Sequence, residues 1–338
     1  MRYLNRRAML TLALFLLCGN ILFAQRVGME YVSELQTNFK GDYNFVNLLK
    51  LNGDLPFSDN VRFRLSTISV ARTNDESIAN DMQEFSNIDV ENIVLAFSVA
   101  GVEWDVDEHN TFLFGVHNVN EETFSSDVTS LFTNSSCGIY PTLSFNYPIA
   151  NYPVASVGMH FVHSDERFGF VGALYNGIGY NAFTGRNNVF RFCPKSDGLF
   201  AISQGEYKYR DSHYFLGGCL HYGELDDIEG KSARPTLWTY AEQKVTNSLT
   251  LLGGYSHAFH SSSYCRDFAG LGGRLIIKNA ELGLFSDYAH FEDVDEWATE
   301  LTCKIPISEH VYVQPTAHFI SKDTEHFVVG VLRLGVEL

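Results

Sequence analysis

The sequence has little positive charge and little proline. Its 338 residues carry 24 Lys and Arg against 40 Asp and Glu, for a formal net charge of −16, and 8 are Pro. A chain with this acidic balance repels phosphate backbones, which argues against nucleic acid as a partner. With 45% hydrophobic residues, the composition also excludes a disordered tail and a collagen-like chain.

Long apolar runs are missing after residue 24. A helix needs about 20 apolar residues to cross a bilayer, and the rest of the sequence has no such run, which excludes a helical membrane protein. The one apolar run, Ala8–Leu17, follows three arginines and precedes Ala24. This order is typical of a secretory signal peptide, so we expect residues 1–24 to be cleaved off and residues 25–338 to form the mature chain.

Cysteines are too few and too scattered for a disulfide framework. The predicted mature chain has five, an odd number without close pairs, and their spacing does not match a zinc site. We expect free thiols with at most one bridge between loops, no bound metal and no cofactor. The five are Cys137, Cys193, Cys219, Cys265 and Cys303.

The sequence does have many aromatic residues, 27 Phe and 17 Tyr, and an alternation of apolar and polar residues. A strand places successive side chains on opposite faces, so a period of two predicts half-buried strands. Residues 49–66 and 102–116 show the pattern on both sides of a turn. Their predicted polar faces carry Lys50, Asn52, Asp54, Arg62, Arg64 and Ser66 in the first segment and Glu103 and Asp105 in the second.

About 16 such segments of about 9 to 11 residues occur, the length that a tilted strand needs to cross a bilayer. Short turns, such as residues 210–212, alternate with long polar connections at residues 73–91, 178–197 and 223–234. A soluble sandwich would bury the apolar faces, whereas a membrane barrel would turn them towards lipid. The alternation of short and long connections favours the membrane barrel, whose two ends are built differently. The sequence therefore predicts an all-β fold: a transmembrane antiparallel β-barrel of the bacterial outer membrane with about 16 strands, formed as one domain by residues 25–338.

Several blocks between residues 95 and 338 resemble the carbohydrate-selective porins of the OprB type. The blocks include Gly115–Thr123 (GVHNVNEET), Phe132–Ser136 (FTNSS), Ala173–Gly177 (ALYNG) and Val313–Pro315 (VQP). The resemblance implies a channel in the outer membrane of a Gram-negative bacterium, in contact with outer-membrane lipid, that passes carbohydrates or other small solutes by diffusion. A homotrimer is the assembly that the family suggests. The chain ends on Leu338, where outer-membrane barrels commonly end on an aromatic residue.

A sugar channel needs weak and repeated binding by charged, amide and aromatic groups along its wall. Arg62, Arg64, Glu103 and Asp105 lie on the predicted polar faces and are the candidates for lining the pore. The alternative is that these charges only face a wet lumen and balance one another. The remaining apolar faces are expected to meet lipid, with Trp104 and Trp238 at the membrane boundary.

Other polar motifs have a structural and a functional interpretation. The Asn134-Ser135-Ser136 stretch could present hydroxyls and an amide to a sugar, but we favour a tight connection in which these groups satisfy the backbone. The His160/His163 and His257/His260 pairs fall in strand-like segments, where a spacing of three places the rings on opposite faces and disfavours a shared metal.

No catalytic residue can be assigned, because the sequence has no nucleophile elbow, no His-Glu-x-x-His motif and no phosphate-binding loop. The main prediction is therefore a porin and not an enzyme. Two alternatives stay open: a non-conducting outer-membrane barrel whose loops bind a ligand or a surface, and an outer-membrane hydrolase whose catalytic groups meet only in space.

Overall fold

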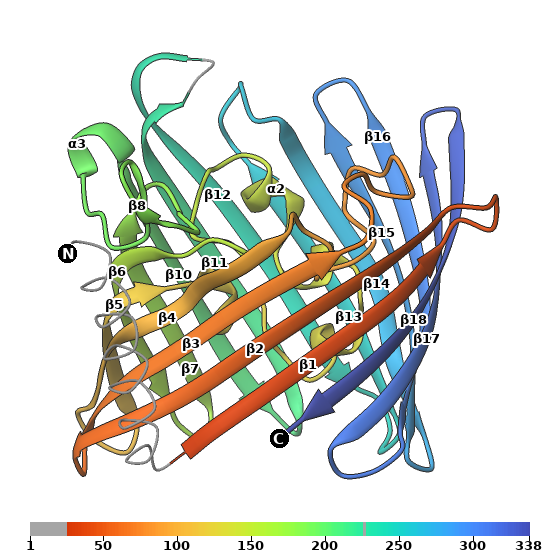
Figure 1. Cartoon of the computed structure of the whole chain (residues 1–338), viewed down its shortest axis with the longest axis horizontal. Helices are drawn as coiled ribbons and strands as arrows, with labels where there is room; N and C mark the ends of the chain where they lie inside the picture. The colour runs from red at the N-terminus through yellow and green to blue at the C-terminus, as the bar shows by residue number, and fades with distance from the viewer. Residues whose placement is uncertain (1–25, 226–227) are drawn as a thin grey trace, which may run out of the picture.

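The computed structural model describes residues 26–225 and 228–338 (Figure 1). The predicted signal peptide, residues 1–24, lies outside the described residues. Within them, sixteen antiparallel strands form a closed barrel in which neighbours along the chain pair with each other and β1 pairs with β18. A separate hairpin, β8 with β9, lies in a connection. The prediction of an all-β barrel with about 16 strands is confirmed.

The barrel strands are 8 to 17 residues long, and most exceed the predicted length. They are β1 (Arg26–Thr37), β2 (Tyr43–Ser58), β3 (Val61–Arg72), β4 (Ile93–Asp105), β5 (Asn110–His117), β6 (Ser156–Ser164), β7 (Phe168–Asn176), β10 (Leu199–Tyr209), β11 (Ser212–Leu225), β12 (Ile228–Lys244), β13 (Leu249–Ala258), β14 (Cys265–Ile277), β15 (Ala280–Phe291), β16 (Asp295–Pro306), β17 (Val311–Lys322) and β18 (Glu325–Glu337).

The two ends of the barrel are built differently. Tight turns, such as residues 210–211 and 278–279, close one end, which also holds the C-terminus (Figure 1). Arg210, Asp211 and Lys278 have positive φ values of 49°, 58° and 59°, the left-handed backbone that two-residue hairpins require. The other end carries the long connections, which in outer-membrane barrels face the cell exterior.

Three connections at the loop end are long: residues 73–92, 118–155 and 177–198. The second contains η1 (Val119–Glu121), η2 (Thr129–Leu131), η3 (Ser135–Cys137) and α2 (Pro141–Ser144), and the third contains β8 (Phe183–Thr184), β9 (Asn187–Asn188) and α3 (Pro194–Asp197). The predicted connections at 73–91 and 178–197 agree with this arrangement.

The predicted connection at residues 223–234 is wrong. β11 continues to Leu225 and β12 begins at Ile228, with a register shift between Gly223 and Leu225. The physical reason is that strands extending beyond the membrane need no apolar face, so their polar composition resembles that of a loop.

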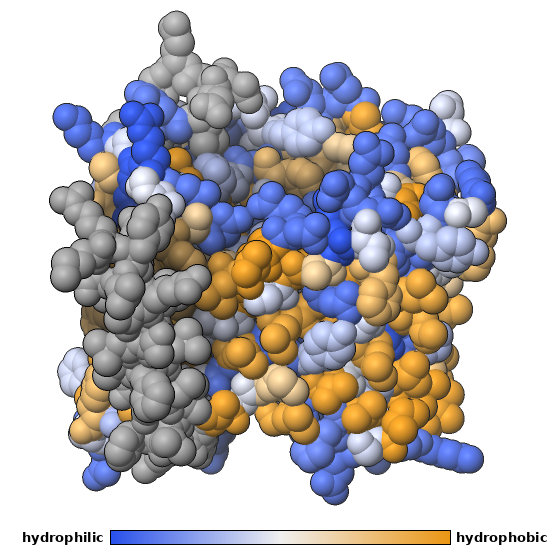
Figure 2. Space-filling model, viewed as in Figure 1, coloured by the Kyte–Doolittle hydropathy of each residue, from blue (hydrophilic) through white to orange (hydrophobic). Residues whose placement is uncertain are grey.

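Alternation decides which side chains face outward on the first strands. Asp54 lies opposite Arg64, and Val102 lies opposite Phe114, as the predicted hairpins require. Leu51, Val102 and Trp104 are exposed on the outside. Apolar residues gather across the middle and lower part of the visible wall, with hydrophilic residues at both rims (Figure 2), as a membrane-spanning wall requires.

Residues 118–155, which we call the inner loop, fold into the barrel and pack against the inner faces of β7 and β10–β15. The resulting core consists of apolar side chains from both parts; it includes Phe124, Leu131, Phe132, Tyr140, Leu143, Tyr147, Phe200, Phe215, Trp238, Tyr240, Phe268 and Phe285. One side of the lumen is therefore filled like the interior of a soluble protein.

This core overturns the expected position of Trp238 at the lipid boundary. Trp238 is 2% exposed, and its indole N–H donates to Oε1 of Gln204 over 3.0 Å, whereas Leu237 faces outward. The sequence pattern placed Trp238 on the wrong face of β12, because the inward Trp238 and Tyr240 and the outward Leu237 are all apolar where the inner loop packs against this strand. Trp104 does face outward, with 42% of its surface exposed.

The five cysteines of the described residues are free thiols, three of them buried. The described helices are all too short or too polar to cross a membrane.

Candidate functional site

Carboxylates on the barrel wall hold the inner loop in place. Glu300 on β16 accepts hydrogen bonds from the backbone N–H groups of Thr133 (2.8 Å) and Asn134 (3.0 Å) and from the Asn134 side-chain amide (2.7 Å). The Asn134 oxygen caps η3 by accepting from the Cys137 N–H (2.9 Å). The structure thus supports the structural interpretation of this stretch: Asn134 satisfies backbone and wall groups.

Residues 73–92 form a second inward connection that is bonded to the first. The Asn87 N–H donates to the Thr133 carbonyl over 2.7 Å. On the wall, Ser86 donates to Glu34 (2.7 Å), and Arg333 donates to Asn87 (2.6 Å) and to Glu34 (2.7 Å). These bonds attach residues 73–92 to β1 and β18, and the bond between Asn87 and Thr133 links residues 118–155 to the same part of the wall.

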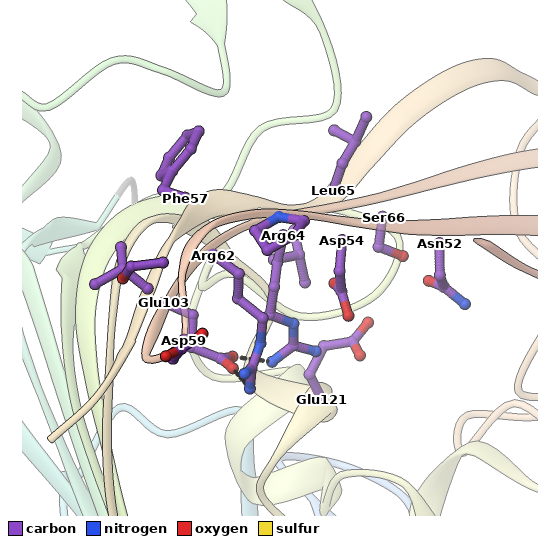
Figure 3. A pocket seen from close by; sticks show the side chains of 14 residues that line it. Asn52, Asp54, Phe57, Asp59, Arg62, Arg64, Leu65, Ser66, Glu103 and Glu121 are labelled. Carbon is purple, nitrogen blue, oxygen red and sulfur yellow. Dashed lines mark hydrogen bonds and ion pairs between the residues drawn. The ribbon is translucent and has the colours of Figure 1, made fainter. Parts of the chain in front are cut away.

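The other side of the lumen contains a polar cavity of about 850 Å³ along β2, β3 and β4. Its lining includes Asn52, Asp54, Arg62, Arg64, Ser66 and Glu103 from the wall and Glu121 from the inner loop. In Figure 3, Arg62 and Arg64 point to the same side of the sheet as Asn52 and Asp54, while Phe57 and Leu65 point away.

The four candidates from the sequence lie together in one network. Arg62 contacts Glu103, which lies directly opposite it on β4, and donates to Asp105 over 2.7 Å. Arg64 donates to the other oxygen of Glu103 over 2.5 Å. Glu103 is 4% exposed and is neutralised by both guanidinium groups. Within this network two guanidinium groups are paired with two carboxylates, so it presents fixed donors and acceptors side by side.

An ion pair that the sequence analysis did not single out crosses from the wall to the inner loop. Lys50 on β2 donates to Glu121 at the end of η1 over 2.8 Å. A second cavity of about 470 Å³ lies beside it, lined by residues that include Lys50, Glu121, Tyr152, Tyr312 and Arg333. Glu121 borders both cavities, so this pair stands between them. Lys50 was on a predicted polar face, but its partner is 71 residues away.

The segment from Glu121 to Val128, the crosspiece, is also fixed at its far end. Ser126 and the Val128 N–H (3.2 Å) donate to Glu242 on β12, which lies halfway round the barrel from β2. A third cavity of about 290 Å³ lies on the β6–β11 side, next to Glu122, Ser126 and Glu242. The crosspiece therefore spans the lumen and divides its open space.

Glu122 is the titratable group of the crosspiece whose ionisation is most affected by its surroundings. Burial raises its pKa to about 7, although Arg64, 4.0 Å away, acts in the opposite direction. Glu122 therefore changes its charge near neutral pH.

The histidine pairs do not form a metal centre in residues 26–225 and 228–338, where no group of three metal-ligating side chains occurs. His160 stacks on His117 with 4.6 Å between ring centroids, whereas His163 bonds to Asn110.

Comparisons with known proteins agree with this geometry. No family model matches the sequence, and no curated protein matches it. Among solved structures, OprB of Pseudomonas putida at high pH superposes with a TM-score of 0.78 and 14% identity, over 93% of this chain and 94% of that one. The chain has an OprB-type porin fold.

Other porin-like barrels are similar at lower scores. An anion-selective porin from Comamonas acidovorans matches with a TM-score of 0.61 and 11% identity, over 92% of this chain and 98% of its own. OmpT of Vibrio cholerae, an outer membrane protein in its trimer form, matches with 0.60 and 10%, over 93% and 98%. The porin fold and the apolar outer wall support a location in the outer membrane of a Gram-negative bacterium.

Proposed function

We propose that this porin barrel is a passive outer-membrane channel for carbohydrates and similar small solutes, and that it catalyses no reaction. The observation that carries the proposal is the polar cavity along β2–β4, which stays open beside an inner loop that fills the opposite side. Arg62, Arg64 and Glu103, which border this cavity, and Asp105, which lies beside it and is bonded to Arg62, are proposed to line this passage.

The chemistry of the lining suits neutral solutes that carry hydroxyl groups. A hydroxyl both donates and accepts hydrogen bonds, and the lining supplies guanidinium and carboxylate groups side by side. Because each arginine is already paired with an acid, the wall lacks the excess of positive charge that an anion-selective pore requires. Tyr152 and Tyr312 add aromatic surface in the second cavity.

We further propose that residues 25–338 act as one porin domain after loss of residues 1–24, and that three copies assemble. The trimer form of the V. cholerae OmpT structure supports this assembly, since its barrel has a similar fold.

A second candidate is a barrel that does not conduct. The observation in its favour is that residues 73–92 and 118–155 are bonded to each other and to both walls, which narrows the lumen. In that case the exposed loops would bind a partner and the cavities would end blindly.

Liposome swelling tests the proposal. Refolded mature protein is placed in liposomes, and entry of mono- to oligosaccharides is compared with entry of amino acids of similar size. Faster entry of sugars supports the proposed channel, equal entry at equal size indicates a general diffusion pore, and no entry by folded protein favours the non-conducting barrel. Heat-dependent migration in SDS gels serves as the check on folding.

A further inference from the structure

The outer wall carries an ordered row of polar side chains at the loop end of β13–β16, which we call the polar strip. His257, Asp267, His290 and Asp295 occupy directly opposed positions on these four successive strands. Histidine and aspartate thus alternate along one line around the barrel. They lie on the outward face, because their neighbours Ser256, Phe268, Ala289 and Glu296 are buried on the lumen side.

The same arrangement of a tyrosine, a histidine and an aspartate occurs twice in the strip. On β13, the Tyr255 hydroxyl donates to Oδ1 of Asp267 over 2.7 Å, and Nδ1 of His257 lies 2.7 Å from the same oxygen. On β15, the Tyr288 hydroxyl donates to Oδ1 of Asp295 over 2.7 Å, and Nδ1 of His290 lies 2.6 Å from it. Each tyrosine and histidine are two residues apart on one strand and share a carboxylate of the next strand.

These bonds leave the outer atoms of the strip available. Both aspartates use only Oδ1, and both histidines use only Nδ1, for bonds within the described stretches. The side chains of His290 and Asp295 are 43% and 54% exposed. The second carboxylate oxygen can accept a hydrogen bond, and the outer ring nitrogen of a histidine whose Nδ1 donates can accept one too.

Aromatic rings lie one row nearer the membrane centre. Tyr255, Tyr288 and Trp297 follow in the next outward row, with Ala269 between the tyrosines. The Tyr288 and Trp297 ring centroids are 4.9 Å apart, and Trp297 is 56% exposed. Further along the same strands the outward residues include Leu251, Leu271, Leu284 and Leu301, and the two outward hydroxyls, of Ser286 and Thr299, are hydrogen-bonded to each other over 2.8 Å.

The order of these rows fixes the level of the strip in the membrane. Aliphatic side chains meet acyl chains, aromatic rings lie at the boundary, and the loops reach into water. The strip lies between the aromatic row and the loops, and the loop end faces the exterior. It therefore lies among the headgroups of the outer leaflet.

We propose that the polar strip binds the sugar headgroup of a glycolipid in the outer leaflet. Sugar hydroxyls can donate to the free carboxylate oxygens and to the free ring nitrogens, and the exposed rings beneath them provide flat contact surface. A bare phosphate headgroup fits less well, because it would face two carboxylates and the strip itself contains no lysine or arginine; Arg266 is the exposed cation next to Asp267 in the chain. This binding concerns the outer wall and does not depend on what passes through the lumen.

Native mass spectrometry of the full mature barrel tests the proposal. The wild type and the D267A/D295A variant are released from nanodiscs made of phosphatidylethanolamine with a minor share of a neutral glycolipid of equal chain length. The control variant E166A/E309A removes the same charge from exposed tight turns at the end of the barrel opposite the strip. We expect the wild type and the control to retain the glycolipid over phosphatidylethanolamine, and D267A/D295A to lose about 90% of this enrichment, a tenfold change.

Three results would overturn the proposal: equal retention of the two lipids by the wild type, unchanged retention in D267A/D295A, or equal loss in the control. A fourth is cross-linking of the His257→Cys variant to a second copy, because the strip would then be a subunit interface. The Y255F/Y288F variant keeps the carboxylates, and its folding can be compared by heat-dependent gel migration, so that a folding failure of the alanine variant still leaves a test of the strip.

Discussion

The inner face of β2–β4 and the inner face of β10–β15 belong to the same barrel but have different chemistry. Towards the turn end of β2–β4, the inward side chains include Arg62, Arg64 and Glu103 and border open space, while Val46, Leu48, Ile68 and Val70 form a buried apolar cluster towards the loop end. On β10–β15 the inward side chains are mainly apolar and aromatic, with Glu242 as a polar anchor, and residues 118–155 pack against them. The wall of this barrel is therefore not uniformly polar on its lumen side: its inner face follows what it contacts, open space in one half and a folded loop in the other.

The largest effect on stability is expected from a substitution in the half of the lumen that the inner loop fills. Trp238→Ala removes a ring that is 2% exposed and should lower the free energy of unfolding by about 3 to 5 kcal/mol, through lost burial and a cavity. Urea unfolding in detergent micelles, followed by far-UV circular dichroism, measures it. Trp104→Ala, on the outward face, is the matched control and should change stability less. Equal losses in the two variants would contradict the packed core.

In the open half, Arg64→Ala should change ion preference as well as stability. Glu103 loses one of its two cationic partners, so the cation-to-anion permeability ratio should rise about two- to fivefold, since charge in a narrow passage sets selectivity. Glu103 is buried but keeps Arg62 as a partner, so the loss of one charged hydrogen bond should cost about 1.5 to 3 kcal/mol in stability, less than Trp238→Ala. Reversal potentials in planar bilayers under a salt gradient give the ratio. Arg210→Ala, at a tight turn, is the control, and an unchanged ratio for Arg64→Ala would place Arg64 outside the ion path.

Removing the ion pair that attaches the crosspiece to β2 tests whether the crosspiece sets the width of the passage. Lys50→Met removes the 2.8 Å bond to Glu121, and single-channel conductance should rise by about 1.5- to 2-fold as the two neighbouring cavities join. Lys244→Met removes a comparable ion pair with Asp211 at a turn and should leave conductance unchanged. A conductance equal to wild type in both variants would show that the pair does not limit flow.

The smallest effect is a pH dependence from Glu122, whose pKa burial raises to about 7. As the pH rises from 5.5 to 8.5, Glu122 becomes ionised and cation preference should increase, while Glu122→Gln should respond less. The folded state holds this proton more tightly than the unfolded state, so the stabilising contribution is fully present below the unfolded pKa near 4.5 and is lost as the pH rises through about 7. Reversal potentials at pH 5.5 and 8.5 measure this change in cation preference. An equal change in Glu122→Gln and the wild type would assign the pH dependence to another group.

Period-two alternation was sufficient to predict the barrel class, the approximate strand number and the polar faces on which Arg62, Arg64, Glu103 and Asp105 lie. These groups lie on β3 and β4, whose register follows from side chains alternating between lipid and water. The same rule failed at Trp238, because the inward Trp238 and Tyr240 of β12 are as apolar as the outward Leu237 where residues 118–155 pack. It also failed at residues 223–234, because strands that leave the membrane lose the alternation. No signal of local spacing could have found the pair of Lys50 and Glu121 or the anchors of the inner loop at Glu242 and Glu300.

The sequence by itself therefore determined the strands and the face that each open-side strand turns to water, since both follow from nearest neighbours along the chain. Only the tertiary structure decided where residues 118–155 go. That choice depends on contacts between groups more than a hundred residues apart, such as Thr133 with Glu300 and Val128 with Glu242. Buried backbone N–H groups must find acceptors wherever the closed wall places them, and the passage is the space that this packing leaves open.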